Sequence, residues 1–249
     1  MKKLIKLLAI IASLLLLNAC VVVESGPSNK EKASDINVQL GIGYLQQNNL
    51  EVANQKLIKA IRLNPDSAMA HNAYAILQER LLHKEKAEEH YRLATELDTL
   101  NSEANNNYGI FLCRSGREKE SEHYFMQALE NPLYKTPEFA YTSAAFCLMK
   151  VENYENAENY LTKALAAKSD FPDALITMAE LKYKTRNFEL VEAYLNRLHE
   201  VDRPSAESLW LSIQTAIQLD RREKIAEYGQ QLEQKFPKSA EYQSWLKIQ

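Results

Sequence analysis

The 249-residue sequence has little glycine, proline or cysteine: six Gly, seven Pro and three Cys. It also lacks any alternating apolar and polar segment long enough to predict a β-sheet. Few chain-breaking residues and no strand pattern favour helices. The apolar fraction of 46% and the charged fraction of 25% are those of an ordinary globular protein that can bury a substantial core. We therefore expect an all-α protein.

Further absences concern chemistry. There is no Gly-rich phosphate loop and no G-x-S-x-G nucleophile motif. The histidines form no H-x-x-x-H pair and are interpreted as exposed polar residues of helices: His71, His83, His90, His123 and His199. Lysine and arginine do not cluster, and the formal net charge is -3, so a nucleic-acid partner is not expected. We expect no catalytic residues, metal site, cofactor or small-molecule substrate.

The N-terminus has a basic start followed by a short apolar run. Lys2, Lys3 and Lys6 lie beside residues 7–17, which would span about 16 Å as a helix, roughly half of a bilayer core. This pattern predicts a cleavable signal peptide over 1–19 rather than a lasting membrane span. Removal of three lysines leaves 27 of the 30 basic residues against 33 acidic ones, a mature net charge of about -6.

The segment LNAC, residues 17–20, resembles the bacterial lipobox, with Asn18 as an uncommon residue at the second position. This resemblance implies that Cys20 receives diacylglycerol, that cleavage precedes it, and that its new amino group is acylated. Each buried methylene of such chains contributes about 0.8 kcal/mol. The alternatives are ordinary secretory cleavage and an uncleaved anchor. Residues 20–34 are predicted as the lipidated Cys and a flexible tether.

From residue 35 to residue 249 the same residue types recur every 34 to 36 residues. The first copy has Leu40, Gly41, Tyr44, Ala53, Leu57, Ala60 and Pro65. The next three have Tyr74, Ala75, Ala87, Tyr91 and Ala94; Tyr108, Gly109, Ser121, Phe125 and Ala128; and Ala144, Ala145, Ala157, Leu161 and Ala164. Two weaker copies follow, with Met178, Ala179, Val191, Leu195 and Leu198, then Ser212, Ile213, Ile225, Gly229, Leu232 and Pro237. These spacings closely resemble the tetratricopeptide (TPR) repeat.

The TPR resemblance implies an α-solenoid, a right-handed superhelix of about six TPR helix pairs. Small residues at matching places in both helices of a pair permit their close approach. Near the C-terminus, Tyr242, Trp245 and Leu246 are expected to form a capping helix that closes the last apolar face.

The first helices of such repeats normally line the concave side of the superhelix. The repeat register places nine residues there as a protein-binding groove: Val38, Ile42, Leu45, Met69, Asn72, Ile76, Glu103, Asn106 and Ile110. Apolar residues flanked by Asn suit an amphipathic helix or an extended peptide. The alternative is that these apolar side chains pack on neighbouring repeats.

Cys113 and Cys147 fall late in the first helices of neighbouring repeats, where the two can meet. An exported chain is in an oxidising compartment, which makes a disulfide possible. Closing a loop of about 34 residues would stabilise the fold by roughly 3–4 kcal/mol. Two separately buried thiols are the alternative.

Three motifs carry a closer resemblance: NNYG at 106–109 with the following Cys113, YFMQAL at 124–129, and NPLYKTPE at 131–138 with the following Cys147. Together they look like the type IV pilus biogenesis lipoproteins of the PilF/PilW family. That resemblance covers nearly the whole mature chain and is least specific in the last two repeats. It also implies a disulfide between Cys113 and Cys147.

The family resemblance implies a pilotin: an outer-membrane lipoprotein on the periplasmic face that binds type IV pilus secretin subunits and promotes their localisation and multimerisation. Pilus biogenesis and twitching motility would then depend on it. Val21 is not the Asp associated with inner-membrane retention, which favours the outer membrane as the lipid-anchored location. The alternatives are another outer-membrane TPR lipoprotein, such as a β-barrel assembly subunit or a protease adaptor, and a scaffold for peptidoglycan enzymes.

Overall fold

The computed structural model describes residues 28–248, which contain thirteen α-helices and no strand. The predicted signal peptide, Cys20 and residues 20–27 of the predicted tether lie outside the described residues. Twelve helices form six consecutive pairs: α2 (Asn29–Gln46) with α3 (Leu50–Leu63), α4 (Ala68–Arg80) with α5 (Lys84–Leu97), α6 (Ser102–Arg114) with α7 (Glu118–Glu130), α8 (Pro137–Lys150) with α9 (Tyr154–Ala167), α10 (Pro172–Lys184) with α11 (Phe188–Val201), and α12 (Ala206–Gln218) with α13 (Arg222–Lys235). A short helix, α14 (Ala240–Leu246), follows the last pair.

The first helix starts earlier than expected, so the tether prediction over 20–34 is wrong from residue 29 onward. Ser28 caps α2: its hydroxyl accepts a hydrogen bond from the Glu31 backbone, and the Glu31 carboxylate accepts one from the Ser28 backbone. This capping box fixes a helix start in a segment whose composition is that of a linker. Ser34 is buried and donates to the carbonyl of Ala60 at 2.9 Å, which makes this turn part of the first repeat.

Small residues let the two helices of each pair approach closely. A Cβ at position 109 in α6 would lie 2.7 Å from the ring of Phe125 in α7, closer than packed atoms allow. The buried side chains gather in six clusters along the chain, each formed within a pair of helices or between neighbouring pairs. Stability in such a stack is the sum of terms from each repeat and its neighbours.

The turns inside the pairs share one backbone feature. The following residues have positive φ, between 51° and 78°, at corresponding places in the six pairs: Asn48, Leu82, Gly116, Glu152, Arg186 and Asp220. Gly and Asn adopt this conformation readily, whereas a Leu side chain strains it. Leu82, Glu152 and Arg186, with φ of 62°, 58° and 60°, are therefore the strained positions among these turns.

The C-terminal end is closed by α14, as predicted. Trp245 packs with Leu209, Ile213 and Leu232 of the last pair. Its indole lies against Gly229, where a Cβ would come within 2.7 Å of the ring. Leu246, which was also expected to close this face, is 45% exposed.

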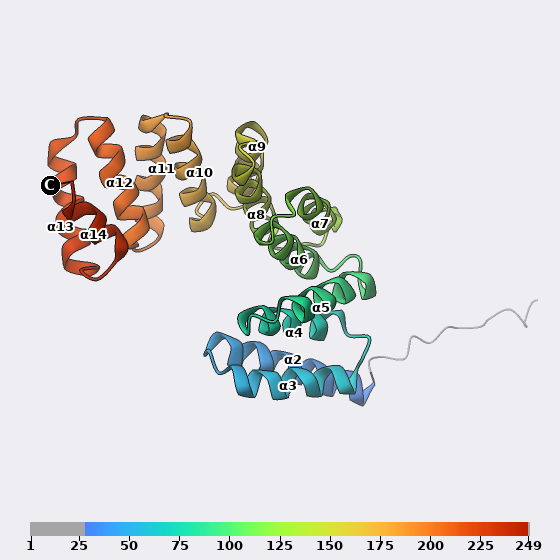
Figure 1. The fold of residues 1–249 in the computed structure, drawn as a ribbon. Helices are drawn as coiled ribbons and strands as arrows, with labels where there is room; N and C mark the ends of the chain where they lie inside the picture. Colours follow the sequence, from blue (N-terminus) through green and yellow to red (C-terminus); the bar gives the residue numbers. More distant parts are fainter. Residues whose placement is uncertain (1–27, 249) are drawn as a thin grey trace, which may run out of the picture.

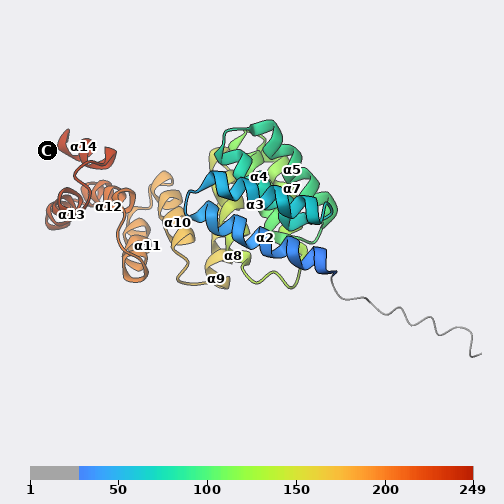
Figure 2. The same cartoon turned by 90° about the horizontal axis from the view of Figure 1, so that it is seen from below.

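The pairs stack into a right-handed superhelix. Figures 1 and 2 show α2–α5 layered together at one end, the chain turning through α6–α9, and α10–α14 continuing to the other end. No helix within residues 28–248 has the length and apolar character needed to cross a bilayer. The described part of the chain is a single helical stack of six TPR-like pairs.

Candidate protein-binding groove

The first helices of successive pairs lie side by side and form the concave face of the superhelix. One position recurs along this face at the repeat spacing and is half-buried or exposed in every pair: Ile42, Ile76, Ile110, Phe146, Glu180 and Gln214. We call these six residues the central row. Its first four members are apolar and its last two are polar, so the chemistry of the face changes between α8 and α10.

Two of the predicted groove residues belong to the core instead, and their assignment to the groove is wrong. Val38 is fully buried and Leu45 is 4% exposed. Both pack in the cluster beneath α2, α3 and α4, because the first helix must also cover its partner helix and the next repeat. Ile42 and Ile76 pack against the same cluster but remain half-buried.

The other predicted groove residues also differ in exposure. Glu103 is exposed, and Met69 is 44% exposed with its sulfur 3.9 Å from Gln39 Nε2. Asn72 is buried, and its Oδ1 accepts a hydrogen bond from Asn107 Nδ2 at 3.2 Å across two repeats. Asn106 is buried too, and its Oδ1 has no partner among the described residues. These Asn side chains therefore contribute more to the floor of the face than to its open surface.

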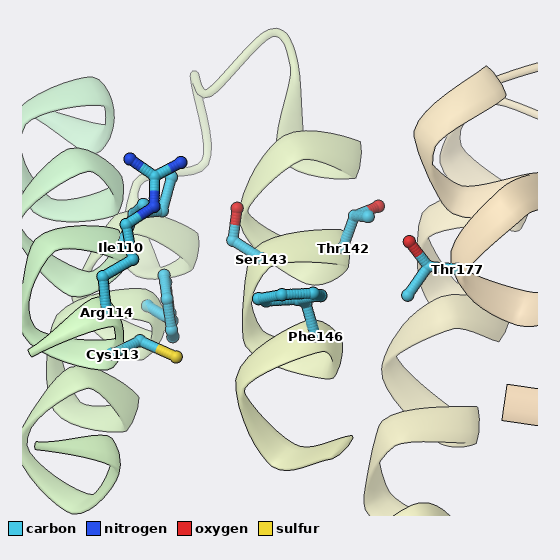
Figure 3. A pocket seen from close by; sticks show the side chains of 8 residues that line it. Ile110, Cys113, Arg114, Thr142, Ser143, Phe146 and Thr177 are labelled. Atoms are coloured by element: carbon cyan, nitrogen blue, oxygen red, sulfur yellow. The ribbon is translucent and has the colours of Figure 1, made fainter. Parts of the chain in front are cut away.

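Ile110 lies between two hollows on the concave face. The first, of about 180 Å³, lies between α6, α8 and α10 and is lined by Ile110, Cys113, Arg114, Phe125, Thr142, Ser143, Phe146 and Thr177. Figure 3 shows Ile110 and Arg114 on one side and Phe146 opposite, on α8. The second, of about 430 Å³, lies between α4 and α6 and is lined by Ile76, Glu79, Arg80, Tyr91, Asn107, Ile110 and Arg114. Together the two hollows form the candidate groove.

Charged groups line the second hollow. The Glu79 carboxylate accepts hydrogen bonds from Arg114 Nη1 at 3.3 Å and from the Tyr91 hydroxyl at 2.9 Å. Burial, with Glu79 beside it, raises the pKa of Tyr91 well above its usual value, so the hydroxyl stays protonated. Arg80 donates to the carbonyl of Leu45 at 2.6 Å. Two guanidinium groups against one carboxylate leave this part of the groove positively charged.

A disulfide joins Cys113 of α6 to Cys147 of α8, with Cα atoms 5.9 Å apart. Each cysteine is adjacent in the sequence to a residue that lines the groove: Arg114 follows Cys113, and Phe146 precedes Cys147. Lys150 donates to the carbonyl of Cys113 at 2.6 Å, a second tie between the same helices. The covalent link therefore fixes the spacing of the two walls of the first hollow.

One histidine departs from the sequence interpretation, because His71 is buried rather than exposed. Its Nε2 donates to the carbonyl of Pro65 at 2.9 Å, which leaves Nδ1 to accept a hydrogen bond from His90 Nδ1 at 2.7 Å. The two rings stack between α4 and α5. This pair is a packed structural contact, and residues 28–248 hold no group of three or more metal-ligating side chains.

Sequence reasoning missed Arg114, Thr142, Ser143, Phe146 and Thr177. The signal for Phe146 was present: it follows Ile110 by the same 36 residues that separate the third and fourth copies of the repeat. The predicted groove residues ended at Ile110, although the repeat register continues through α8. Arg114 carried a register signal too, because Arg80, Arg114, Lys150 and Lys184 recur at the same repeat spacing. Its contact with Glu79 could not be predicted from that spacing.

Comparison with known proteins first defines the class. A tetratricopeptide-repeat family model matches residues 148–221. A crystal structure of the APC/C hetero-tetramer Cut9–Hcn1 has the same fold, with a TM-score of 0.74 at 13% identity over 87% of this chain and 42% of that one. The chain therefore has the TPR superhelical fold.

Closer relatives define the family. The chain is 32% identical to the type IV pilus assembly protein PilF of Pseudomonas aeruginosa, over 87% of this chain and 86% of PilF. The solved structure of P. aeruginosa PilF has a TM-score of 0.78 at 31% identity, over 89% of this chain and all of that one. The crystal structure of PilW, described as a widely conserved type IV pilus biogenesis factor, has a TM-score of 0.79 at 32% identity, over 86% and 98%. The chain belongs to the PilF/PilW family, and this homology supports a role in type IV pilus biogenesis.

Proposed function

We propose that this protein is a pilotin: a lipoprotein anchored through Cys20 to the periplasmic face of the outer membrane, which binds type IV pilus secretin subunits and promotes their localisation and multimerisation. Family membership supports the pilus role, and the lipobox-like LNAC segment supports the anchor. A superhelix with an open groove supports binding of a protein segment rather than chemistry.

The observation that carries the binding proposal is the first hollow, walled by Ile110 and Phe146. Phe146 is 51% exposed, although an aromatic ring in this position would be expected to find cover. A secretin segment that inserts an apolar side chain between these two residues would bury them both. The positive charge around Arg114 and Arg80 favours a segment that is acidic or neutral beside that apolar side chain.

The binding proposal is tested with the mature soluble chain, residues 21–249, and the purified periplasmic part of the secretin. Phe146→Glu places a charge in the apolar wall, and we expect affinity to fall at least about tenfold, as for loss of a central anchor residue. Gln214→Glu is the matched control, because it adds the same charge at the same register in the polar half of the central row. Circular dichroism checks that both variants are folded. Equal affinities for the two variants would contradict the proposed site.

The anchor is tested separately with Cys20→Ser in the full chain. We expect a folded protein that still binds secretin subunits in solution but leaves them outside the outer membrane, because the acyl chains are lost. Cell fractionation and the yield of secretin multimers measure this. Normal secretin assembly in that variant would refute the lipid-dependent part and leave the groove proposal standing.

A further inference from the structure

The superhelix has two long edges formed by different loops. The loops that join one pair to the next meet the N-terminal ends of the first helices; we call this the linker edge. The turns inside the pairs form the opposite edge, which we call the turn edge. Figure 1 shows that α2 begins at the same end of the first two pairs as the loop from α3 to α4, on the linker edge.

Large apolar side chains are exposed on the linker edge where no repeat can cover them. Leu133 in the loop after α7 is 82% exposed, and Leu100 in the loop after α5 is 58% exposed. Asn131 donates from Nδ2 to the carbonyl of Leu100 at 2.9 Å, so these two loops are held together. Phe139, 42% exposed at the start of α8, stacks edge-on against Phe171 of the next loop. The apolar positions therefore follow three consecutive loops.

Charged groups beside these side chains are mixed in sign. Lys135 is exposed next to Leu133, and Asp98 is exposed next to Leu100. A lysine beside an exposed leucine suits a bilayer surface, because its long side chain can reach phosphate groups while the leucine enters the acyl region. The turn edge also has exposed apolar residues, Leu82 and Val151, so exposure alone does not distinguish the two edges.

The position of the chain's entry does distinguish them. Nine residue steps separate Cys20 from Asn29, the first residue of α2, which allows a reach of at most about 30 Å. The 18 residues of α2 extend about 27 Å from the linker edge towards the turn edge. A lipid on Cys20 can therefore enter a bilayer that lies against the linker edge without using the full reach between Cys20 and Asn29. A bilayer that lies against the turn edge would require nearly all of that reach.

We propose that the linker edge rests on the phospholipid bilayer, with Leu100, Leu133 and Phe139 entering the interfacial region and Lys135 facing the phosphates. This inference rests on the proposed lipid anchor at Cys20. It adds an orientation: the N-terminal ends of α6 and α8 face the membrane, so the hollow between these two helices opens to the side. The partner of this surface is lipid, in contrast to the protein segment proposed for the groove.

The test uses the full lipidated chain in vesicles of phosphatidylethanolamine and phosphatidylglycerol. Leu133→Cys and Leu82→Cys each introduce one reactive thiol, because Cys113 and Cys147 are paired and Cys20 carries lipid in the proposed form. An environment-sensitive fluorophore is attached, and spin-labelled lipids are added as quenchers. We expect quenching at position 133 to be roughly threefold that at position 82, with emission at shorter wavelength. Equal quenching, or more at position 82, overturns the proposal.

Lys135→Cys and Val151→Cys form a second matched pair on the same two edges, should either leucine variant fold poorly. Stronger quenching at position 135 supports the linker edge, and stronger or equal quenching at position 151 refutes it. Flotation with the vesicles is measured first. A chain that does not float refutes the anchor and with it this orientation. Secretin binding is measured in solution without vesicles, so its result is independent of this one.

Discussion

The two halves of the concave face are built on one register but offer different chemistry. In α2, α4, α6 and α8 the central row is Ile42, Ile76, Ile110 and Phe146, with hollows on either side of Ile110. In α10 and α12 the row continues as Glu180 and Gln214. A disulfide ties the first half at α6 and α8, and the described residues hold no second bridge.

This contrast teaches that the fold and the chemistry of the concave face depend on different positions of the repeat. The small and apolar residues that pack the pairs recur through all six copies, because each helix pair must bury the same face. The central row is less constrained by that requirement, since its side chains are half-buried or exposed at the margin of the clusters. The same backbone can therefore present an apolar wall in one half and a polar one in the other.

Removal of the disulfide should have the largest effect on this contrast. Replacing Cys113 and Cys147 together with Ser should lower the free energy of unfolding by about 3–4 kcal/mol, because the bridge closes a loop of 34 residues. Urea unfolding of the mature chain measures the change. Reductant should produce a similar loss in the unmodified protein and none in the variant. A variant as stable as the parent would show that helix packing alone holds this half.

The polar half should respond to pH through Glu180. Burial, together with the Glu207 carboxylate, raises the pKa of Glu180 from 4.5 to about 7. The native state thus keeps a proton that the unfolded chain releases between these values. The resulting stability is complete below about pH 4.5 and is lost as pH rises through 7. Glu180→Gln should raise the melting temperature at pH 8 by about 2–4 °C, measured by circular dichroism. Gln214→Glu, which adds a carboxylate elsewhere on the row, should not.

The apolar half should respond in the opposite direction through His90. Burial, followed by the neighbouring His71, lowers the pKa of His90 below its usual value of 6.5. Lys86 acts in the same direction and Glu89 against it. Neutral His90 is thus favoured in the native state, so this contribution is present above pH 6.5 and is lost as pH falls through the native pKa. His90→Gln should flatten the acid side of the stability profile. An unchanged slope between pH 7 and pH 5 would contradict this assignment.

The smallest expected effect concerns the turn at Leu82. Its positive φ strains a Leu side chain, and Gly116 occupies the corresponding place one repeat later. Leu82→Gly should therefore stabilise the chain by up to about 0.5–1 kcal/mol, since relief of strain exceeds the added entropy of the unfolded state. Thermal unfolding measures the gain. Gly116→Leu is the reciprocal variant and should destabilise by at least as much.

The sequence predicted the architecture well because the repeat signal concerns packing. Gly41 and Ala53 mark where helices touch, and such contacts are local in the chain, so spacing alone locates the pairs. Which side chains remain exposed on the concave face also depends on how the next repeat packs. A prediction from the spacing within one repeat does not take that packing into account. Val38 and Leu45 were misplaced for that reason. The early start of α2 was hidden because Ser28 and Glu31 lie in a segment with the composition of a linker.

The disulfide has a further consequence for how the stack opens. A solenoid in which each pair touches only its neighbours loses structure first at its ends, where one side lacks support. The bridge joins the third and fourth pairs, in the middle of the six. Fraying from either end therefore halts at a cross-linked centre, and that centre carries Ile110 and Phe146. The segment proposed to bind the secretin is therefore the last part of the chain to unfold.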